Sequence, residues 1–195
     1  MATIQFHATG TSPLLQHNER LANPLDVHAR EIAKVSKKRG KTIADHELLS
    51  KLEFKGGIYF DKELGPYVPG TWIDRALEQA GKIEKLGTAI KQSAHCVEDR
   101  IAIRLNGKTP KQPTIDSLWQ AGCYDQRCVG VQRKKTLRTR PCFKEWQLTF
   151  NVMYDETVLE EAQIMRAMQR AGERIGIGDY RPRFGRFTVE TSNGK

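Results

Sequence analysis

Residues 172–190, here called the Gly/Arg segment, combine residue types that suit contact with phosphate groups. Four glycines allow positive φ and a close approach of the main chain to a ligand: Gly172, Gly176, Gly178 and Gly185. Four arginines supply forked donors for anionic oxygens: Arg174, Arg181, Arg183 and Arg186. Three aromatic rings offer faces for stacking of nucleobases: Tyr180, Phe184 and Phe187. We interpret the segment as a phosphate-binding loop. The alternative is a glycine-capped helix end that turns into an edge strand, with solvated arginines.

A second cationic stretch, residues 127–144, precedes the Gly/Arg segment. It contains seven lysines and arginines and no acidic residue over 18 positions. Val129, Val131 and Leu137 alternate with polar residues around a cationic turn, which predicts a β-hairpin. We call it the basic hairpin and expect it to contact phosphates, with a merely solvated cationic face as the alternative. Its candidate binding residues are Arg127, Arg133, Lys134, Lys135, Arg138, Arg140 and Lys144.

The overall charge agrees with a polyanionic partner. The 195-residue chain has 32 lysines and arginines against 23 aspartates and glutamates, which gives a formal net charge of +9. This excess favours nucleic acid over an acidic or neutral partner. No run of 18 apolar residues occurs, and the first residues lack the charged and apolar regions of a signal peptide. We therefore expect a soluble cytoplasmic protein with no membrane contact.

No group of residues indicates catalysis or a bound cofactor. The four cysteines form no Cys-x-x-Cys pair, so free thiols are expected. The alternative is a zinc site built from Cys123, Cys128, Cys142 and His95. The early histidines have no second catalytic group beside them in the sequence: His7, His17 and His28. Paired carboxylates for two-metal chemistry and a P-loop are also missing. The sequence predicts a protein that is not an enzyme and that has no cofactor.

The elements that must position the two cationic segments begin with a strand at residues 4–8, where apolar and polar residues alternate. Residues 12–24 are predicted to be an extended polar arm. Asp26 is the expected N-cap of a helix over residues 26–38, and Thr42 is the expected cap of the next helix. A further helix begins at Thr71.

The second half of the chain has clearer periodicity. Alternation over residues 97–105 predicts a central strand, and residues 146–154 predict a second one with aromatic and aliphatic side chains on one face. Residues 157–171 have the apolar spacing of an amphipathic helix, and residues 185–191 are the expected final strand. In this order the elements approximate a split βαββαβ arrangement.

The predicted fold class is therefore α+β, with a ferredoxin-like or RRM-like βαββαβ core. A helical insertion is expected at about residues 24–94, together with the basic hairpin. At 195 residues the chain has the size of a single domain, which we expect to span residues 1–195.

This combination of a βαββαβ core, a basic hairpin and a late glycine-rich loop with arginines resembles the RNA-binding RAMP superfamily of CRISPR effector proteins. The motif residues are Gly176 and Gly178, followed by Phe184-Gly185-Arg186-Phe187. The resemblance implies RNA binding, and it implies assembly of several copies along a strand.

The chain is also similar to an uncharacterised family of bacteriophage and prophage proteins. That resemblance is carried by Arg-Pro-Arg-Phe-Gly-Arg-Phe at residues 181–187, Leu-Ala-Asn-Pro at residues 21–24 and Arg-Thr-Arg-Pro at residues 138–141. It implies a viral origin and a location in the infected bacterial host cell.

The function expected from these features is non-catalytic binding of single-stranded nucleic acid, either RNA or DNA. The hairpin cations would neutralise phosphates, the Gly/Arg segment would hold the backbone, and the aromatic rings would stack on bases. One alternative is a viral inhibitor of host defence that binds a small nucleotide signal or an acidic host protein. A further alternative is a virion-associated structural protein. Expected partners are single-stranded nucleic acid, further copies of the chain as a homo-oligomer, and a host defence component.

Overall fold

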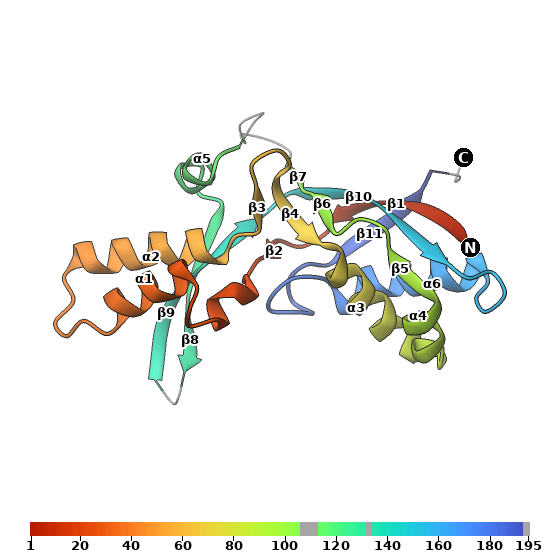
Figure 1. The fold of residues 1–195 in the computed structure, drawn as a ribbon, viewed down its shortest axis with the longest axis horizontal. Helices are drawn as coiled ribbons and strands as arrows, with labels where there is room; N and C mark the ends of the chain where they lie inside the picture. The colour runs from red at the N-terminus through yellow and green to blue at the C-terminus, as the bar shows by residue number, and fades with distance from the viewer. Residues whose placement is uncertain (106–112, 132–133, 193–195) are drawn as a thin grey trace.

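The protein is represented by a computed structural model, which describes residues 1–105, 113–131 and 134–192 (Figure 1). Its main sheet contains β1 (Ala2–Gly10), β5 (Ala94–Cys96), β10 (Trp146–Tyr154) and β11 (Phe187–Thr191). The strands lie in the spatial order β11-β1-β10-β5, and each is antiparallel to its neighbour. The first and third of these strands along the chain are therefore central, and the second and fourth lie outside them.

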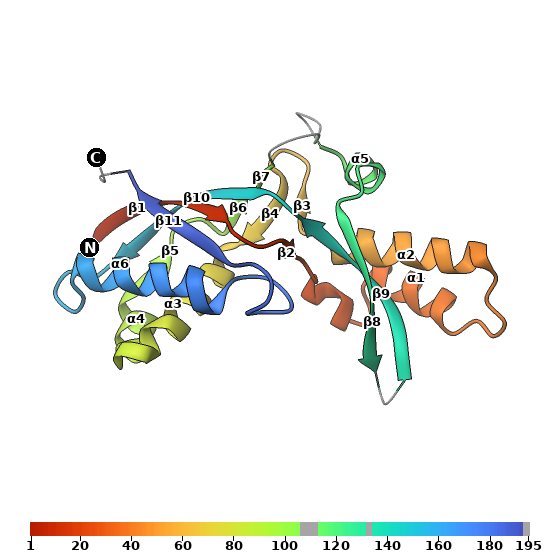
Figure 2. The ribbon, with the colours of Figure 1, turned by 180° about the vertical axis from the view of Figure 1, so that it is seen from behind.

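Two helices make the crossover connections of this sheet. α3 (Gly70–Gly81) lies between β1 and β5 in the sequence, and α6 (Glu161–Arg170) lies between β10 and β11. Together with α4 (Gly87–Ser93) they cover one face of the sheet, as Figures 1 and 2 show from opposite sides. The connection from β1 to β5 crosses β10, and the connection from β10 to β11 crosses β1. This is the ferredoxin-like strand order. The predicted α+β class is confirmed.

The alternation seen in the sequence explains the core. β10 buries every second residue, starting with Trp146, while β1 buries Ile4, Phe6 and Ala8. The inward face of α6 adds apolar side chains such as Met168. Fully burying side chains of this size stabilises the fold by about 2 kcal/mol each. The main core thus lies between the sheet and its helices.

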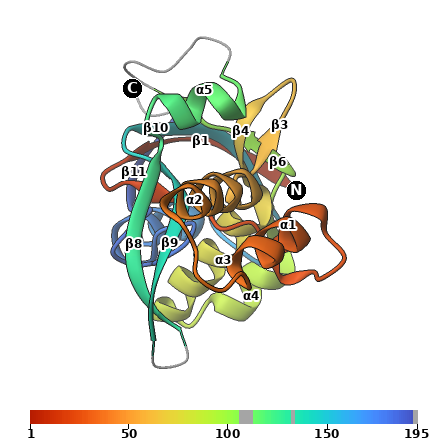
Figure 3. The same cartoon turned by 90° about the vertical axis from the view of Figure 1, so that its left-hand side faces the viewer.

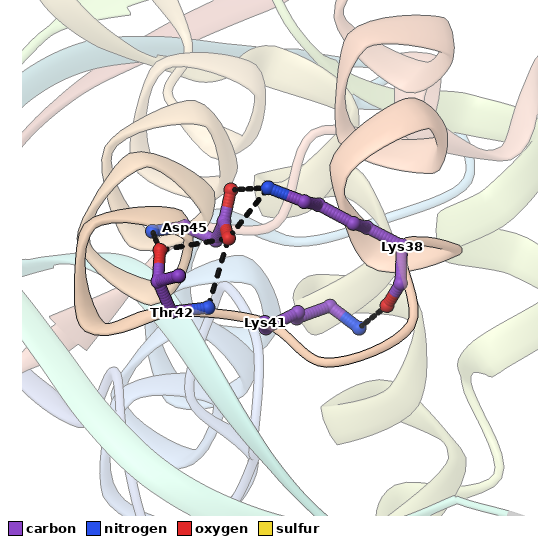
Figure 4. Close-up of polar contacts among 4 residues, drawn as sticks. All are labelled: Lys38, Lys41, Thr42 and Asp45. Carbon is purple, nitrogen blue, oxygen red and sulfur yellow. Dashed lines mark hydrogen bonds and ion pairs between the residues drawn. The ribbon is translucent and has the colours of Figure 1, made fainter.

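Two further helices, α1 (Val27–Ser36) and α2 (Ile43–Gly57), project to one end of the molecule (Figure 1). Their caps are those expected from the sequence, since Asp26 accepts bonds from the first turn of α1 and Thr42 forms a capping box with Asp45. The turn between the helices is held by Lys38, whose Nζ lies 2.8 Å from both carboxylate oxygens of Asp45, and by Lys41, which donates to the Lys38 carbonyl (Figure 4).

The predicted insertion at residues 24–94 includes two helices that pack on the main sheet, α3 and α4. α3 buries Ile73, Ala76, Leu77 and Ala80 in the main core, because its apolar stripe faces the sheet and α6. The elements between β1 and α3 lie outside the βαββαβ order. Besides α1 and α2 they include β2 (Leu14–Leu15), the 3-10 turn η1 (Glu19–Ala22), β3 (Phe60–Asp61) and β4 (Gly65–Pro69).

The basic hairpin is present as β8 (Tyr124–Val131) and β9 (Lys134–Phe143). It extends away from the sheet beside α1 and α2, and the short helix α5 (Ile115–Gln120) lies near its base (Figure 3). α2 packs against β9, and the aromatic rings of Phe54, Trp119 and Tyr124 contact one another where α2, α5 and β8 meet.

The predicted continuous strand at residues 97–105 is wrong. The chain instead forms β5, then β6 (Arg100–Ala102), which pairs with β4, and then β7 (Arg104–Leu105), which returns to β10. At the break, the Glu98 carboxylate accepts hydrogen bonds from the backbone and side-chain nitrogens of Asn151 at 2.9 and 2.6 Å. The Glu98 side chain thus replaces the missing strand contact with β10. An alternation pattern in the sequence does not reveal such a contact.

The extended arm at residues 12–24 also contains more structure than the sequence predicted. Leu14 and Leu15 are fully buried as β2, which pairs with Phe143 and Cys142 of β9. A two-residue strand after Pro13 is too short to show a period, so its tertiary pairing decides its conformation.

Candidate nucleic-acid interface

The hairpin and the Gly/Arg segment, which are far apart in sequence, meet on opposite sides of β2. Leu15 pairs with Cys142 of the hairpin, and its carbonyl accepts a 2.9 Å hydrogen bond from the backbone N–H of Asp179. The backbone N–H of Gly185 donates to the Pro13 carbonyl at 2.9 Å. The two predicted binding segments therefore form one surface, and the arm that joins them was not among the predicted site residues.

Arg127 clamps the hairpin to the Gly/Arg segment. Its guanidinium lies 4.6 Å from the ring centroid of Phe184 and 5.4 Å from that of Tyr180. The same group makes a two-point contact with the Asp125 carboxylate, with Nη2 2.7 Å from Oδ2. This contact holds the pKa of Asp125 below its usual value. Arg127 has a carboxylate and two rings as partners, so its main role in the fold is structural.

Two other hairpin arginines are also paired with acidic residues. Arg138 Nη1 lies 2.5 Å from Oε1 of Glu53, which is 7% exposed and whose Oε2 accepts a 2.8 Å bond from the Thr139 backbone. Arg140 Nε lies 2.5 Å from Oδ2 of Asp179, close enough for an ion pair although the angles are not those of a hydrogen bond.

These pairs correct the expectation that the hairpin arginines face phosphates without competition from acids. The stretch has no carboxylate of its own, but Asp125 next to it, Glu53 of α2 and Asp179 of the Gly/Arg segment supply one to each arginine. Arg133 lies outside the described residues, as does the side chain of Lys134. The predicted cations that are exposed are Lys135, Lys144, Arg174, Arg181, Arg183 and Arg186.

The glycines of the Gly/Arg segment serve the packing of the segment itself. Of the four glycines for which the sequence analysis allowed positive φ, Gly176, Gly178 and Gly185 have it, whereas Gly172 lies in the π-helical turn without it. A Cβ on Gly185 would lie 1.8 Å from the Ile177 carbonyl oxygen, and one on Gly178 would lie 2.4 Å from that of Leu15. Gly176 is buried and its N–H donates to the Ala171 carbonyl at 2.7 Å, and its contact with a phosphate stays a prediction. The close approach is to the protein's own backbone.

The stacking role expected of the aromatic residues is reduced to one ring. Phe187 is 1% exposed in the main core, and Phe184 is 9% exposed beneath Arg127, so neither offers a free face. Tyr180 is 43% exposed, and its φ of 61° is unusual for a residue other than glycine. Such backbone strain is typical of functional positions. Tyr180 is the ring of this segment that a base can reach.

Three adjoining hollows surround Tyr180. The first, the hairpin hollow, has a volume of about 580 Å³ and lies between η1, α1 and the hairpin. The central hollow, about 200 Å³, lies between α3 and Asp179, and the loop hollow, about 500 Å³, extends along the Gly/Arg segment. His17 lines the first two, Arg181 lines the last two, and Tyr180 lines the first and third. The three hollows are therefore neighbours that share lining residues, and together they are here called the depression.

Several lining residues were missed by the sequence analysis. α3 contributes Trp72 and Arg75 to the central hollow and Gln79 to the loop hollow. Arg75 and Gln79 are exposed and lie one helical turn apart, opposite the buried stripe of the helix. A polar face on α3 was visible in the sequence, but its position next to the Gly/Arg segment was not.

His17 separates the hairpin hollow from the central hollow. Partial burial of its imidazole is the main cause that lowers its pKa, and Arg140 and Arg138 lower it further, although Asp179 acts in the opposite direction. His17 as a whole residue is nonetheless exposed to solvent. The ring is therefore neutral near pH 7 and gains a charge on acidification.

The open face of the main sheet has a different character. It presents amide, hydroxyl and imidazole groups, with His7 in a row between Glu190 and Thr149. The two ring nitrogens of His7 lie 3.1 Å from Thr149 Oγ1 and 2.9 Å from Ser192 Oγ, so this histidine is satisfied. Among the described residues, the outward positions of β1, β10 and β11 carry no phenylalanine, tyrosine, tryptophan, lysine or arginine. The aromatic platform of an RRM is therefore not found on this face.

The described part of the chain has no group of three His, Cys, Asp or Glu residues arranged to hold a metal ion. The cysteines are free thiols, and burial raises the pKa of Cys142 to about 11. Across the same residues, none of the helices has both the length and the apolar character that a membrane span requires.

No protein-family model matches the sequence, and no curated protein matches it. Among solved structures, the fold is similar to a chain of the Type III-B Cmr-beta complex bound to cognate target RNA, solved by cryo-EM. The sequence identity is 15%, the TM-score is 0.49, and the match covers 97% of this chain. The present chain spans 60% of the length of that one.

Proposed function

We propose that this protein binds single-stranded nucleic acid, RNA or DNA, in the depression formed by the three hollows. The observation that carries the proposal is the meeting of the hairpin and the Gly/Arg segment around three neighbouring hollows with exposed cations. Exposed arginines line it from two elements: Arg75, Arg174 and Arg181. Tyr180 lies between the hollows where it can stack on a base.

The shape and charge of the depression favour a single strand. Its hollows follow one another around an exposed ring, so successive nucleotides can occupy successive hollows. Phosphates would pair with the exposed arginines, whose planar donors match phosphate oxygens. On the open face of the main sheet, the described outward positions of β1, β10 and β11 carry no lysine or arginine, and this face is not part of the proposed site.

Fluorescence polarisation with labelled single-stranded RNA, single-stranded DNA and duplex, at several lengths and two salt concentrations, tests the proposal. We expect length-dependent binding to single strands, with a salt slope that corresponds to about four neutralised phosphates. Replacing Arg75, Arg174 and Arg181 together with alanine should weaken binding by on the order of a hundredfold, at about 1 kcal/mol per contact. The matched control replaces three exposed cations outside the hollows, Lys37, Arg39 and Lys62. Equal losses of affinity in both variants would mean that binding depends only on nonspecific electrostatic attraction.

We also propose that the bound strand is not cleaved. Incubation of labelled RNA with the protein should leave the strand intact on a denaturing gel. Cleavage that disappears in a His17→Ala variant would overturn this part of the proposal, because His17 is the histidine that lines the depression.

A second candidate function, binding of a small nucleotide, is supported by the size of the hairpin hollow, which lies within the range of ligand pockets. It predicts saturable binding of a mono- or dinucleotide with weak salt dependence. Length dependence separates the two functions. A bacteriophage origin, assembly with further copies of the chain and contact with a host defence component remain predictions of the sequence.

A further inference from the structure

The hairpin hollow differs in its lining from the two hollows beside it. One wall is apolar, formed by Leu21 of η1, Ala29 and Ile32 of α1, and Val129 of the hairpin. The lining also includes Arg138, which lies on the same face of the hairpin as Val129, and Tyr180. A planar molecule in this hollow could contact hydrocarbon together with a guanidinium or a phenol ring.

The hairpin hollow is also close to neutral in charge. Arg138 is paired with Glu53, and Arg140 is paired with Asp179 at the edge of the hollow. The pKa of His17, which also lines the hollow, is lowered. A phosphate placed here would compete with two carboxylates that already hold the arginines. An uncharged heterocycle meets no such competition and gains from burial of its faces.

Free cations lie around the neighbouring hollows instead. Arg75, Arg174 and Arg181 line the central and loop hollows and are exposed. Charge and apolar surface are thus separated within one depression, as the phosphates and bases are separated within a nucleotide strand.

We propose that the hairpin hollow is a subsite for one unstacked nucleobase of the bound strand, with the adjoining phosphates on the arginines of the central and loop hollows. This subsite rests on the proposed function and adds to it a position at which a base, and not the backbone, is recognised. Burial of one base against the apolar wall contributes to affinity whatever the sequence of the strand, because every base has two planar faces.

The test uses the shortest single-stranded RNA that still binds tightly, so that the strand has one register. In a series of RNAs, each position in turn carries an abasic site. Wild-type protein should lose about five- to tenfold in affinity at one position and much less at the others. Ala29→Trp fills the hollow from its apolar wall and should remove this position-specific loss, while the salt slope stays the same.

Val27→Trp is the matched control, because Val27 lies on the same helix, is 57% exposed and does not line the hollow. It should keep the wild-type abasic profile. Ile32→Trp provides a second filling variant if Ala29→Trp does not give the wild-type circular dichroism spectrum. An abasic profile that is uniform in wild type, or that is retained in the filled variants, overturns the subsite alone. Failure of wild type to bind any single strand overturns the proposed function and the subsite together.

Discussion

At the scale of single residues, the arginines of the candidate interface divide into two groups by their partners. Arg127, Arg138 and Arg140 are each held by a carboxylate, and two of them also lie against Tyr180. Arg181 is exposed between two hollows. The same residue type therefore has a structural role in the hairpin, whereas in the Gly/Arg segment it is exposed and available for the proposed binding.

Replacing Arg181 with alanine should weaken strand binding about fivefold and leave the unfolding midpoint unchanged, because it removes an exposed cation. Replacing Arg127 should lower the midpoint, because it leaves Asp125 unpaired and uncovers Phe184. Polarisation binding and urea denaturation of both variants measure the two effects, and Arg39→Ala is the control for net charge. A stable Arg127→Ala protein with a large loss of affinity would contradict this division.

His17 gives the interface a pH dependence of known sign. Its folded pKa lies below the usual 6.5, so its contribution to stability is complete above that value and is lost as the pH falls through the folded pKa. A nearby phosphate favours the charged imidazole, so strand binding should become tighter over the same acidic window. Binding titrations above and below pH 6.5 with wild type and His17→Gln check this. A pH response that persists unchanged in the glutamine variant would assign it to another group.

At the scale of elements, β2 and the glycines decide how the binding segments are held. β2 pairs with the hairpin on one side and accepts the Asp179 N–H on the other, so a two-residue strand positions both. The loop that follows η3, a π-helical turn at Ala171–Ile175, closes on itself through Gly185, whose carbonyl accepts the Ile177 N–H at 2.9 Å.

Gly185→Ala should therefore destabilise the protein by about 2 kcal/mol or more, since its φ is 71° and the new Cβ would meet a backbone oxygen. Gly40→Ala is a suitable control, because Gly40 has a φ of 62° and no atom within 4 Å of the added Cβ. The difference between their urea midpoints isolates the contribution of packing from that of the dihedral angle. Equal midpoints would show that the loop yields to the extra atom.

The hairpin is also fixed to α2 through Glu53. Glu53→Ala should cost about 1–3 kcal/mol, because it leaves the Thr139 N–H without its acceptor and Arg138 without its carboxylate. The lower part of that range is expected if solvent reaches Arg138, which is 35% exposed. Glu47→Ala, at an exposed position of the same helix, is the control in chemical denaturation. A midpoint equal to that of the control would mean that the hairpin does not depend on this contact.

At the scale of the whole molecule, the proposed site and the open face of the main sheet are separate surfaces. The hollows lie beside the hairpin and α3, whereas the open face of the sheet is polar and lacks exposed lysine or arginine on its described central strands. The hairpin extends away from the sheet, and α3 lies on the face of the sheet that the helices cover (Figures 1 and 2). The ferredoxin-like core thus acts as a support for a site built from its connections.

His7→Ala, in the middle of that open face, should consequently leave strand affinity unchanged. The side chain is bonded to Thr149 and Ser192, so a small loss of stability is expected without a loss of binding. Polarisation assays with the same oligonucleotides as above give the answer. Loss of affinity in a folded His7→Ala protein would move the site to the sheet.

The sequence by itself determined β1, β10, α6 and β11 of the core, the caps of α1 and α2 and the presence of the basic hairpin. These features depend on local rules: alternation in β1 and β10, the side-chain oxygens of Asp26 and Thr42, and runs of like charge. They could be predicted because each is encoded within one short stretch of chain. The positive φ of the three glycines was predicted for the same reason.

Only the tertiary structure decided which of the predicted residues remain free to bind. Glu53 and Arg138 are 85 positions apart, and no local pattern pairs them. Phe184 and Phe187 look alike in the sequence as stacking rings, yet both are buried, whereas Tyr180 is exposed. Arg75, Trp72 and His17 join the depression only because α3 and β2 pack beside the Gly/Arg segment. Charge and ring type are properties of a residue, but availability depends on which groups from distant parts of the chain pack against it.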